Sequence, residues 1–205
     1  MGDTEDAAAV YDRVSARAAS LGVAIAPEEL AELAVRHSMG GGELAALDAV
    51  FSYLADKRHD QVIETLLKLS RLPQKAPKTF AGFDFDRIRG RDAGALRKLP
   101  ALANLHARKN LAFIGPGGIG KTHLAQAYGR ECCLNGYKTY YLKATELRDK
   151  LRRAADSGSV SRAVAALVKP SCLIVDEGGA RSTRRARISS SMSSTGATRR
   201  TAPIR

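Results

Sequence analysis

Eight consecutive residues in the middle of the chain have the types and spacing of a phosphate-binding loop. They are Gly115, Pro116, Gly117, Gly118, Ile119, Gly120, Lys121 and Thr122. Because glycines lack a Cβ, successive backbone N–H groups can turn inward around a polyphosphate. The lysine can reach the β- and γ-phosphates as a point charge, and the threonine hydroxyl can bind Mg²⁺. The pattern predicts a site for a nucleoside triphosphate.

The sequence on either side of this loop supplies the strand and the helix that such a loop needs. The apolar run Leu111–Ile114 predicts a strand before it, and residues 123–134 have a helical pattern after it. The positive end of the helix dipole, beginning near His123, adds to the attraction for phosphate, so residues 115–123 form the predicted nucleotide-binding set. A glycine-rich turn with a chance lysine is the alternative, and the flanking pattern disfavours it.

Two acidic residues follow a second apolar run, 55 residues beyond Lys121: Asp176 and Glu177 after 171–175. A carboxylate at the end of a buried strand can meet the Mg²⁺ held by Thr122, which predicts Thr122 and Asp176 as the metal ligands. The next acid can hold and polarise the water that attacks the γ-phosphate. Lys121 and Glu177 are therefore the predicted catalytic residues, with ATP and Mg²⁺ as the predicted cofactors.

The remaining pattern between the loop and these acids alternates strands with helices. Residues 139–142 are β-branched and aromatic, which predicts a second strand, and residues 144–155 predict a helix. The run before Asp176 is apolar throughout, as expected of a central strand in a parallel sheet. Residues 94–107, before the loop, also have helical spacing. We predict an α/β fold with a parallel sheet.

The first seventy residues predict helices instead of strands. Pro27 and two following glutamates are typical of a first helical turn, and apolar stripes recur at helical spacing on both sides of the break at 40–42. Pro73 and Pro77 then predict a linker over 71–90. Three phenylalanines in it are expected to anchor it to the following domain; an adenine-stacking role for one of them is left open.

The net charge of +12 is unevenly distributed along the chain. Residues 1–56 hold ten acidic and three basic residues, whereas residues 57–179 hold 23 basic and eleven acidic ones. This asymmetry favours duplex DNA as a partner, with a solvated basic surface as the alternative. No apolar run is long enough to cross a bilayer, the acidic start of the chain is unlike a secretory signal, and the three cysteines fit no disulfide or zinc pattern. We therefore expect a cytoplasmic protein with no membrane partner.

Taken together, residues from about Leu66 to Glu177 resemble the IstB-like family of AAA+ ATPases, the ATP-binding helper proteins of insertion sequences, which are related to the DnaC helicase loaders. The segments that carry the resemblance are 69–73, 78–80, 83–85, 110–111, 115–122, 123–125, 136–138, 144–147 and 176–177. The first fifty or so residues match the family only in being helical.

The resemblance implies a P-loop NTPase of the AAA+ type that acts as a DNA-dependent ATPase, assembles on duplex DNA and directs the transposase of the same element to its target. By position, Lys121 and Thr122 would bind phosphate and Mg²⁺, Asp176 the metal, and Glu177 the attacking water. Replicative helicase loading on the same fold is an alternative. A small-molecule P-loop kinase is disfavoured, because the Asp176–Glu177 pair suits water activation.

The resemblance ends at Gly178 and Gly179. Residues 180–205 hold seven Arg, six Ser, four Thr and four Ala, with no Leu, Val, aromatic or acidic residue, a composition that predicts disorder. In the family this part of the chain would hold the sensor strand, which lies between the loop strand and the strand before Asp176, and an arginine that reaches a neighbour's nucleotide. The composition of residues 180–205 predicts that both are missing here. We predict four segments: a helical region 1–70, a linker 71–90, an incomplete ATP-binding domain 91–179 and a tail 180–205 that is either out of frame or DNA-binding.

Because the domain is incomplete, a non-catalytic remnant that binds only nucleotide or a partner is the alternative function. ATP hydrolysis is left open, and the family-type homo-oligomer is not expected.

Overall fold

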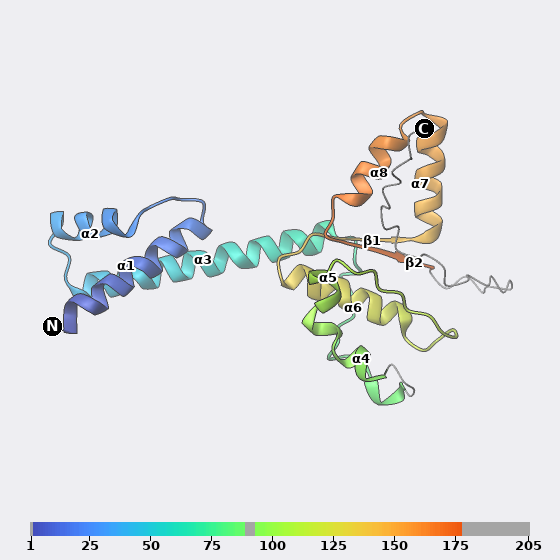
Figure 1. Ribbon diagram of the computed structural model, residues 1–205, viewed down its shortest axis with the longest axis horizontal. Helices are drawn as coiled ribbons and strands as arrows, with labels where there is room; N and C mark the ends of the chain where they lie inside the picture. The colour runs from blue at the N-terminus through green and yellow to red at the C-terminus, as the bar shows by residue number, and fades with distance from the viewer. Residues whose placement is uncertain (1, 89–92, 178–205) are drawn as a thin grey trace, which may run out of the picture.

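A computed structural model describes residues 2–88 and 93–177. One long helix connects two regions that lie at its opposite ends (Figure 1). The helical region consists of α1 (Gly2–Ser20), α2 (Pro27–Arg36) and the amino-terminal half of α3 (Gly41–Leu69). The sheet region comprises residues 70–88 and 93–177. Its elements are η1 (Phe85–Arg87), α4 (Ala93–Arg97), η2 (Leu99–Ala101), α5 (Ala103–His106), α6 (Lys121–Leu134), β1 (Thr139–Lys143), α7 (Ala144–Asp156), α8 (Val160–Val168) and β2 (Cys172–Asp176).

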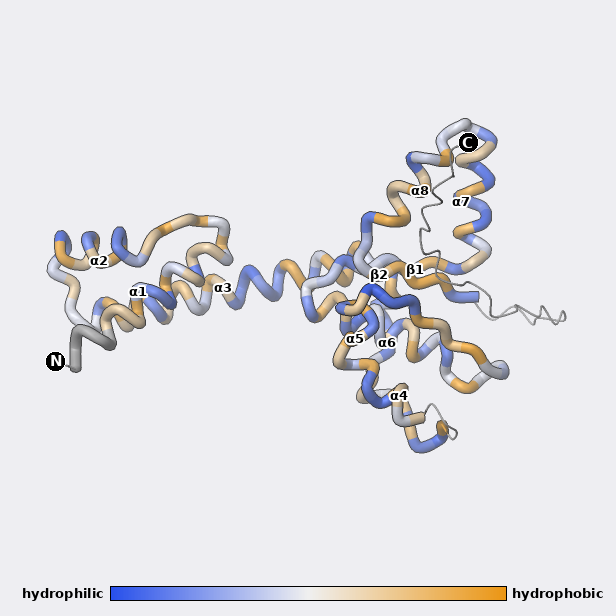
Figure 2. Tube along the Cα trace, in the orientation of Figure 1, coloured by the Kyte–Doolittle hydropathy of each residue, from blue (hydrophilic) through white to orange (hydrophobic). Residues whose placement is uncertain are grey.

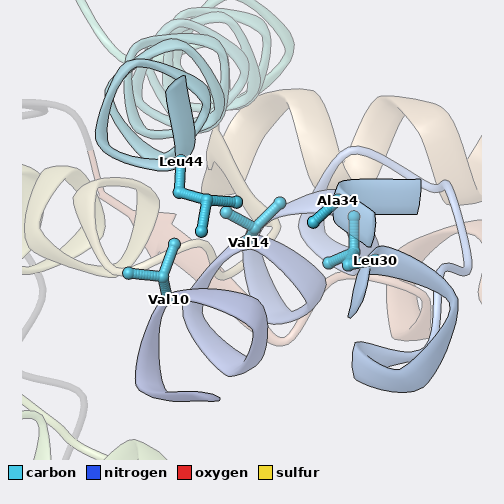
Figure 3. Close-up of a cluster of buried hydrophobic side chains, with 5 residues drawn as sticks. All are labelled: Val10, Val14, Leu30, Ala34 and Leu44. Atoms are coloured by element: carbon cyan, nitrogen blue, oxygen red, sulfur yellow. The ribbon is translucent and has the colours of Figure 1, made fainter. Parts of the chain in front are cut away.

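The helical region has an apolar core of its own. Side chains from all three helices meet there: Val10, Val14, Leu30, Ala34 and Leu44 (Figure 3). Polar contacts between α1 and α3 surround it, because Asp48 pairs with Arg13 and Arg17. The start of α2 is the predicted one, since it begins at Pro27 and Glu29 accepts a hydrogen bond from the Ala26 N–H (2.8 Å).

The middle of α3 joins the two regions with little packing of its own. Residues 56–62 are all exposed, and the tube in Figure 2 has a hydrophilic stretch where α3 leaves the helical region. The apolar pattern predicted after the break at 40–42 belongs to one helix of 29 residues. In the described part of the chain no helix is both long and apolar enough to cross a membrane.

The sheet region is built around two parallel strands. β1 and β2 pair in register from Thr139 opposite Cys172 to Lys143 opposite Asp176, and α7 and α8 form the connection between them. Helix α6 packs against both strands. The end of α3 is joined to β1, because the Ser70 carbonyl accepts a hydrogen bond from the Tyr141 N–H (2.8 Å). The predicted α/β class with an incomplete parallel sheet is thus confirmed.

The expected strand before the glycine-rich loop is not present. Residues 111–114 are irregular, and their backbone makes no backbone hydrogen bond with any other described residue. A strand is stable only when a neighbour pairs with its N–H and C=O groups. Within residues 2–88 and 93–177 no strand lies between this segment and β2, which therefore has β1 as its single neighbour instead of the expected central position.

The expected helix over 94–107 is broken into three short pieces. Pro100 lies in the 3₁₀ turn η2, and Leu102 adopts a left-handed conformation (φ 51°) before α5 begins. A proline inside a helix removes a backbone donor and clashes with the preceding turn, which explains the break. Leu102 is nevertheless buried (1% exposed), so the apolar spacing did identify a core residue.

Candidate functional site

The glycine-rich loop runs directly into the start of α6. Gly118 and Gly120 have positive φ angles (81° and 93°), which residues with a Cβ rarely adopt. The Gly120 carbonyl accepts the first helical hydrogen bond, from the Leu124 N–H (2.9 Å). A Cβ built on Gly120 would lie 2.5 Å from the Phe83 ring, so glycine is also needed for the approach of that ring.

The linker (residues 71–88 in the structure) packs against the start of α6, next to the glycine-rich loop. Phe83 packs edge-on against His123 (ring centroids 5.2 Å apart) and Phe85 (4.9 Å). The His123 Nε2 atom lies 2.8 Å from the Thr79 carbonyl oxygen. Phe80, Phe83 and Phe85 all pack on the cluster that includes Leu124 and Tyr128. The predicted anchoring by these phenylalanines is present, and the ring of His123 faces the linker.

Lys121 bends back over the loop. Its ammonium group donates hydrogen bonds to the carbonyl oxygens of Gly115 (2.9 Å) and Pro116 (2.6 Å). These carbonyls are replaceable partners, because a phosphate oxygen carries a full charge and forms stronger charge-assisted hydrogen bonds. Lys121 is therefore held at the loop and available to an anion placed within it.

The loop and the acidic pair meet, although they are far apart in the sequence. The Thr122 hydroxyl donates a hydrogen bond to Asp176 Oδ1 (3.0 Å). Glu177 follows β2 directly and is exposed. Lys121, Asp176 and Glu177 line one cavity of about 500 Å³, together with residues from 109–113 and 171–175. Lys121, Glu177 and Asp176 thus line one cavity, and Thr122 is joined to it through its hydrogen bond to Asp176.

The separation of the Thr122 and Asp176 oxygens suits a shared magnesium ion. Two ligands about 2.1 Å from Mg²⁺ and at right angles to each other lie about 3 Å apart. The observed 3.0 Å matches that separation, and a hydroxyl and a carboxylate are both oxygen ligands of the kind Mg²⁺ takes. The residues present therefore fit the metal.

Two residues outside the predicted set complete the arrangement. The Tyr141 hydroxyl donates to Asp176 Oδ2 (2.7 Å), and Gln126 Nε2 donates to the Tyr141 oxygen (3.2 Å). Burial, more than the bond to Asp176, raises the pKa of Tyr141, which keeps the phenol protonated and able to donate. Two sequence signals could have found these residues. Alternation along β1 places Tyr141 on one face of the strand, and the spacing of four residues between Thr122 and Gln126 places Gln126 on the face of α6 that lies opposite.

The chain matches the family described as IstB-like ATP binding protein over residues 16–191. This match is longer than the expected resemblance from Leu66 to Glu177. The match includes most of the helical region, which corrects the expectation that the first fifty or so residues would resemble the family only in being helical. The helices of this region contain no distinctive motif by which the family could be recognised from the sequence. The match also continues past the expected end at Gly178 and Gly179, into residues outside the described part of the chain.

Several curated proteins named for ATP binding in insertion sequences are similar to this chain. It is 44% identical over 117 residues to that of IS5376 from Geobacillus stearothermophilus, covering 57% of this chain and 46% of the relative. It is 35% identical over 166 residues to the ATP-binding protein of IS1162 from Pseudomonas fluorescens, and the match covers 77% of this chain and 67% of that relative. It is 34% identical over 122 residues to the ATP-binding protein of IS21 from Pseudomonas aeruginosa, and the match covers 60% of this chain and 45% of that relative. The matched part thus spans about half the length of the first and third of these relatives.

The family match covers most of the chain and includes both the loop and the acidic pair that the fold brings together. The relatives it resembles share the same type of name. The chain therefore belongs to the family of IstB-like ATP-binding proteins of insertion sequences.

Proposed function

We propose that this chain binds ATP with Mg²⁺ and hydrolyses it as a helper of transposition, directing the transposase of its element to duplex DNA. The observation that carries the proposal is the hydrogen bond between Thr122 and Asp176, which joins the phosphate-binding loop to the acid at the end of β2. The names of the relatives support ATP as the nucleotide and an insertion sequence as the context.

Each residue of the site has a separate role in this proposal. The backbone N–H groups of the loop and the Lys121 ammonium bind the phosphates, and Thr122 and Asp176 hold Mg²⁺, which would neutralise charge on the phosphate oxygens. Glu177 is exposed at the cavity beside Asp176, where it can accept a proton from an attacking water. Hydrolysis then depends on Glu177, whereas nucleotide binding depends on Lys121.

ATP turnover by the purified chain, with and without duplex DNA, tests this proposal. The matched variants are Lys121→Ala and Glu177→Gln. We expect DNA-stimulated turnover that both variants lose, with nucleotide binding kept by Glu177→Gln and lost by Lys121→Ala. Binding without turnover in the wild-type chain would contradict the catalytic part and leave a nucleotide-binding protein.

That second candidate, a protein that binds nucleotide without hydrolysing it, is favoured by a specific observation. The backbone of 111–114 has no partner among the described residues, and Leu173 and Val175 on β2 are 40% and 45% exposed. A loop whose leading segment is unpaired holds its phosphate-binding groups less rigidly, and catalysis is more sensitive than binding to small displacements.

DNA binding has a candidate surface in the sheet region. Arg71, Lys150, Arg153 and Arg162 line a cavity of about 670 Å³ between α7 and α8, together with Glu146 and Asp149. Arg71 and Lys150 both lie over the aromatic ring of Tyr140, at 5.7 Å and 5.4 Å from its centroid. Four cations against two carboxylates leave a positive excess, which suits a phosphate backbone.

The double variant Lys150→Ala/Arg153→Ala tests this surface. Because each lost phosphate contact weakens DNA binding and its salt dependence, we expect a lower affinity for duplex DNA and a shallower salt slope. Unchanged DNA binding would place the DNA surface elsewhere. Separate pull-downs with the transposase and with the replicative helicase distinguish transposition from helicase loading.

A further inference from the structure

Asp176 is held by two hydroxyl groups from different elements. Thr122 on α6 donates to Oδ1 (3.0 Å), and Tyr141 on β1 donates to Oδ2 (2.7 Å). Each oxygen of the carboxylate therefore has its own donor, and rotation of the carboxylate about its last bond would break both hydrogen bonds.

The phenol of Tyr141 is fixed in turn. Gln126 on α6 donates to its oxygen (3.2 Å), and both side chains are buried, each 8% exposed. Thr122 and Gln126 are four residues apart, so they lie one turn apart on the same face of α6. Thr122, Asp176, Tyr141 and Gln126 thus form a chain of hydrogen bonds that joins α6, β1 and β2.

The ring of Tyr141 is packed as well as hydrogen-bonded. It belongs to a buried cluster with Leu72, Cys133 and Ile174, the last of which is its register partner on β2. Packing on the ring and a donor on its oxygen leave the hydroxyl little freedom. Such a group can hold a carboxylate in one orientation.

We propose that Tyr141 is the positioning residue for magnesium: it holds Asp176 Oδ2 so that Oδ1 and the Thr122 hydroxyl face the Mg²⁺ of bound Mg-ATP. This inference rests on the proposed nucleotide binding. Mg²⁺ demands near-ideal octahedral geometry, so a carboxylate that rotates freely binds it less well. Loss of a hydrogen-bond partner behind a metal ligand typically weakens metal binding about 10-fold or more.

The test is a titration of free Mg²⁺ with a fluorescent ATP analogue, on the wild-type chain and Tyr141→Phe. The control is Tyr140→Phe, which removes a hydroxyl from the adjacent residue of β1; that hydroxyl accepts a hydrogen bond from Arg71 (3.2 Å) instead of contacting Asp176. We expect Tyr141→Phe to raise the half-saturating Mg²⁺ concentration about 10-fold. Nucleotide affinity without Mg²⁺ should stay unchanged, and Tyr140→Phe should behave as the wild type.

A purely structural role for Tyr141 would lower nucleotide affinity equally with and without Mg²⁺, and that result would overturn the inference. So would a Mg²⁺ response equal to that of Tyr140→Phe. Gln126→Met keeps the phenol and removes only its donor, so a smaller rise in the same direction is expected; it serves if Tyr141→Phe fails to fold. Absence of nucleotide binding by the wild-type chain would overturn the proposed function as well.

Discussion

The helical region and the sheet region differ in how their parts are brought together. In the helical region three helices adjacent in the sequence bury one another's apolar stripes around Leu44 and Val14. In the sheet region the site joins Thr122 to Asp176, 54 residues away. The edge of β2 away from β1 has no partner among the described residues. The comparison indicates that the helical region supplies its own stability, whereas the sheet region depends on long-range contacts for its function.

The largest expected effect lies in the helical core. Leu44→Ala removes a side chain that is 7% exposed and lies beside Val10 and Val14 of α1 in the core of the helical region (Figure 3). Truncation of a buried leucine costs about 2–5 kcal/mol of unfolding free energy. We expect hydrogen exchange to rise over α1, α2 and the start of α3, with nucleotide affinity unchanged. A parallel loss of nucleotide binding would show that the two regions are not independent.

Lys121→Ala should have the complementary effect. Removal of a charge-assisted contact to phosphate costs about 1.5–3 kcal/mol, or roughly 10- to 100-fold in nucleotide affinity. Since the ammonium contacts only loop carbonyls in the described structure, thermal unfolding of the chain without nucleotide should hardly change. Lys143→Ala, which removes an exposed lysine at the end of β1, is the matched control and should bind nucleotide normally.

Local patterns predicted the helical region, the phosphate-binding loop and the acidic pair, because each of these is formed by residues close together in the sequence. Pro27 marked the start of α2, and the glycines marked the loop. The failure at 111–114 has a different origin: an apolar run forms a strand only if a neighbour pairs with it, and no local pattern states that. Alternation along β1 and helical spacing along α6 place Tyr141 and Gln126 on facing surfaces, but the contact of Tyr141 with Asp176 arises from packing between elements, which a local pattern does not state.

Gly129→Ala tests how closely the sheet region is packed. A Cβ at this position on α6 would meet Ile174 Cδ1, with Thr139 Cγ2 at 3.2 Å and Leu72 Cδ1 at 3.4 Å. Overpacking of this kind costs about 1–3 kcal/mol. Because Ile174 is two residues from Asp176, a shift of β2 should also weaken Mg²⁺-dependent nucleotide binding. Gly94→Ala, where no described residue lies within 4 Å of the added Cβ, is the control; it gains the helix propensity of alanine without overpacking and should lower neither property.

The smallest expected effect separates the two regions most sharply. Arg58→Gly lies in the exposed stretch of α3 between them, where stability depends on helix propensity because residues 56–62 have little packing. Relative to Arg58→Ala, which loses the same charge, glycine costs about 1 kcal/mol. Hydrogen exchange of the amides around residue 58 should therefore rise about fivefold relative to the alanine variant. If nucleotide affinity is equal in the two variants, α3 acts as a connector. A lower affinity in the glycine variant alone would mean that α3 transmits the state of the helical region to the site, through its contact with β1 at Ser70.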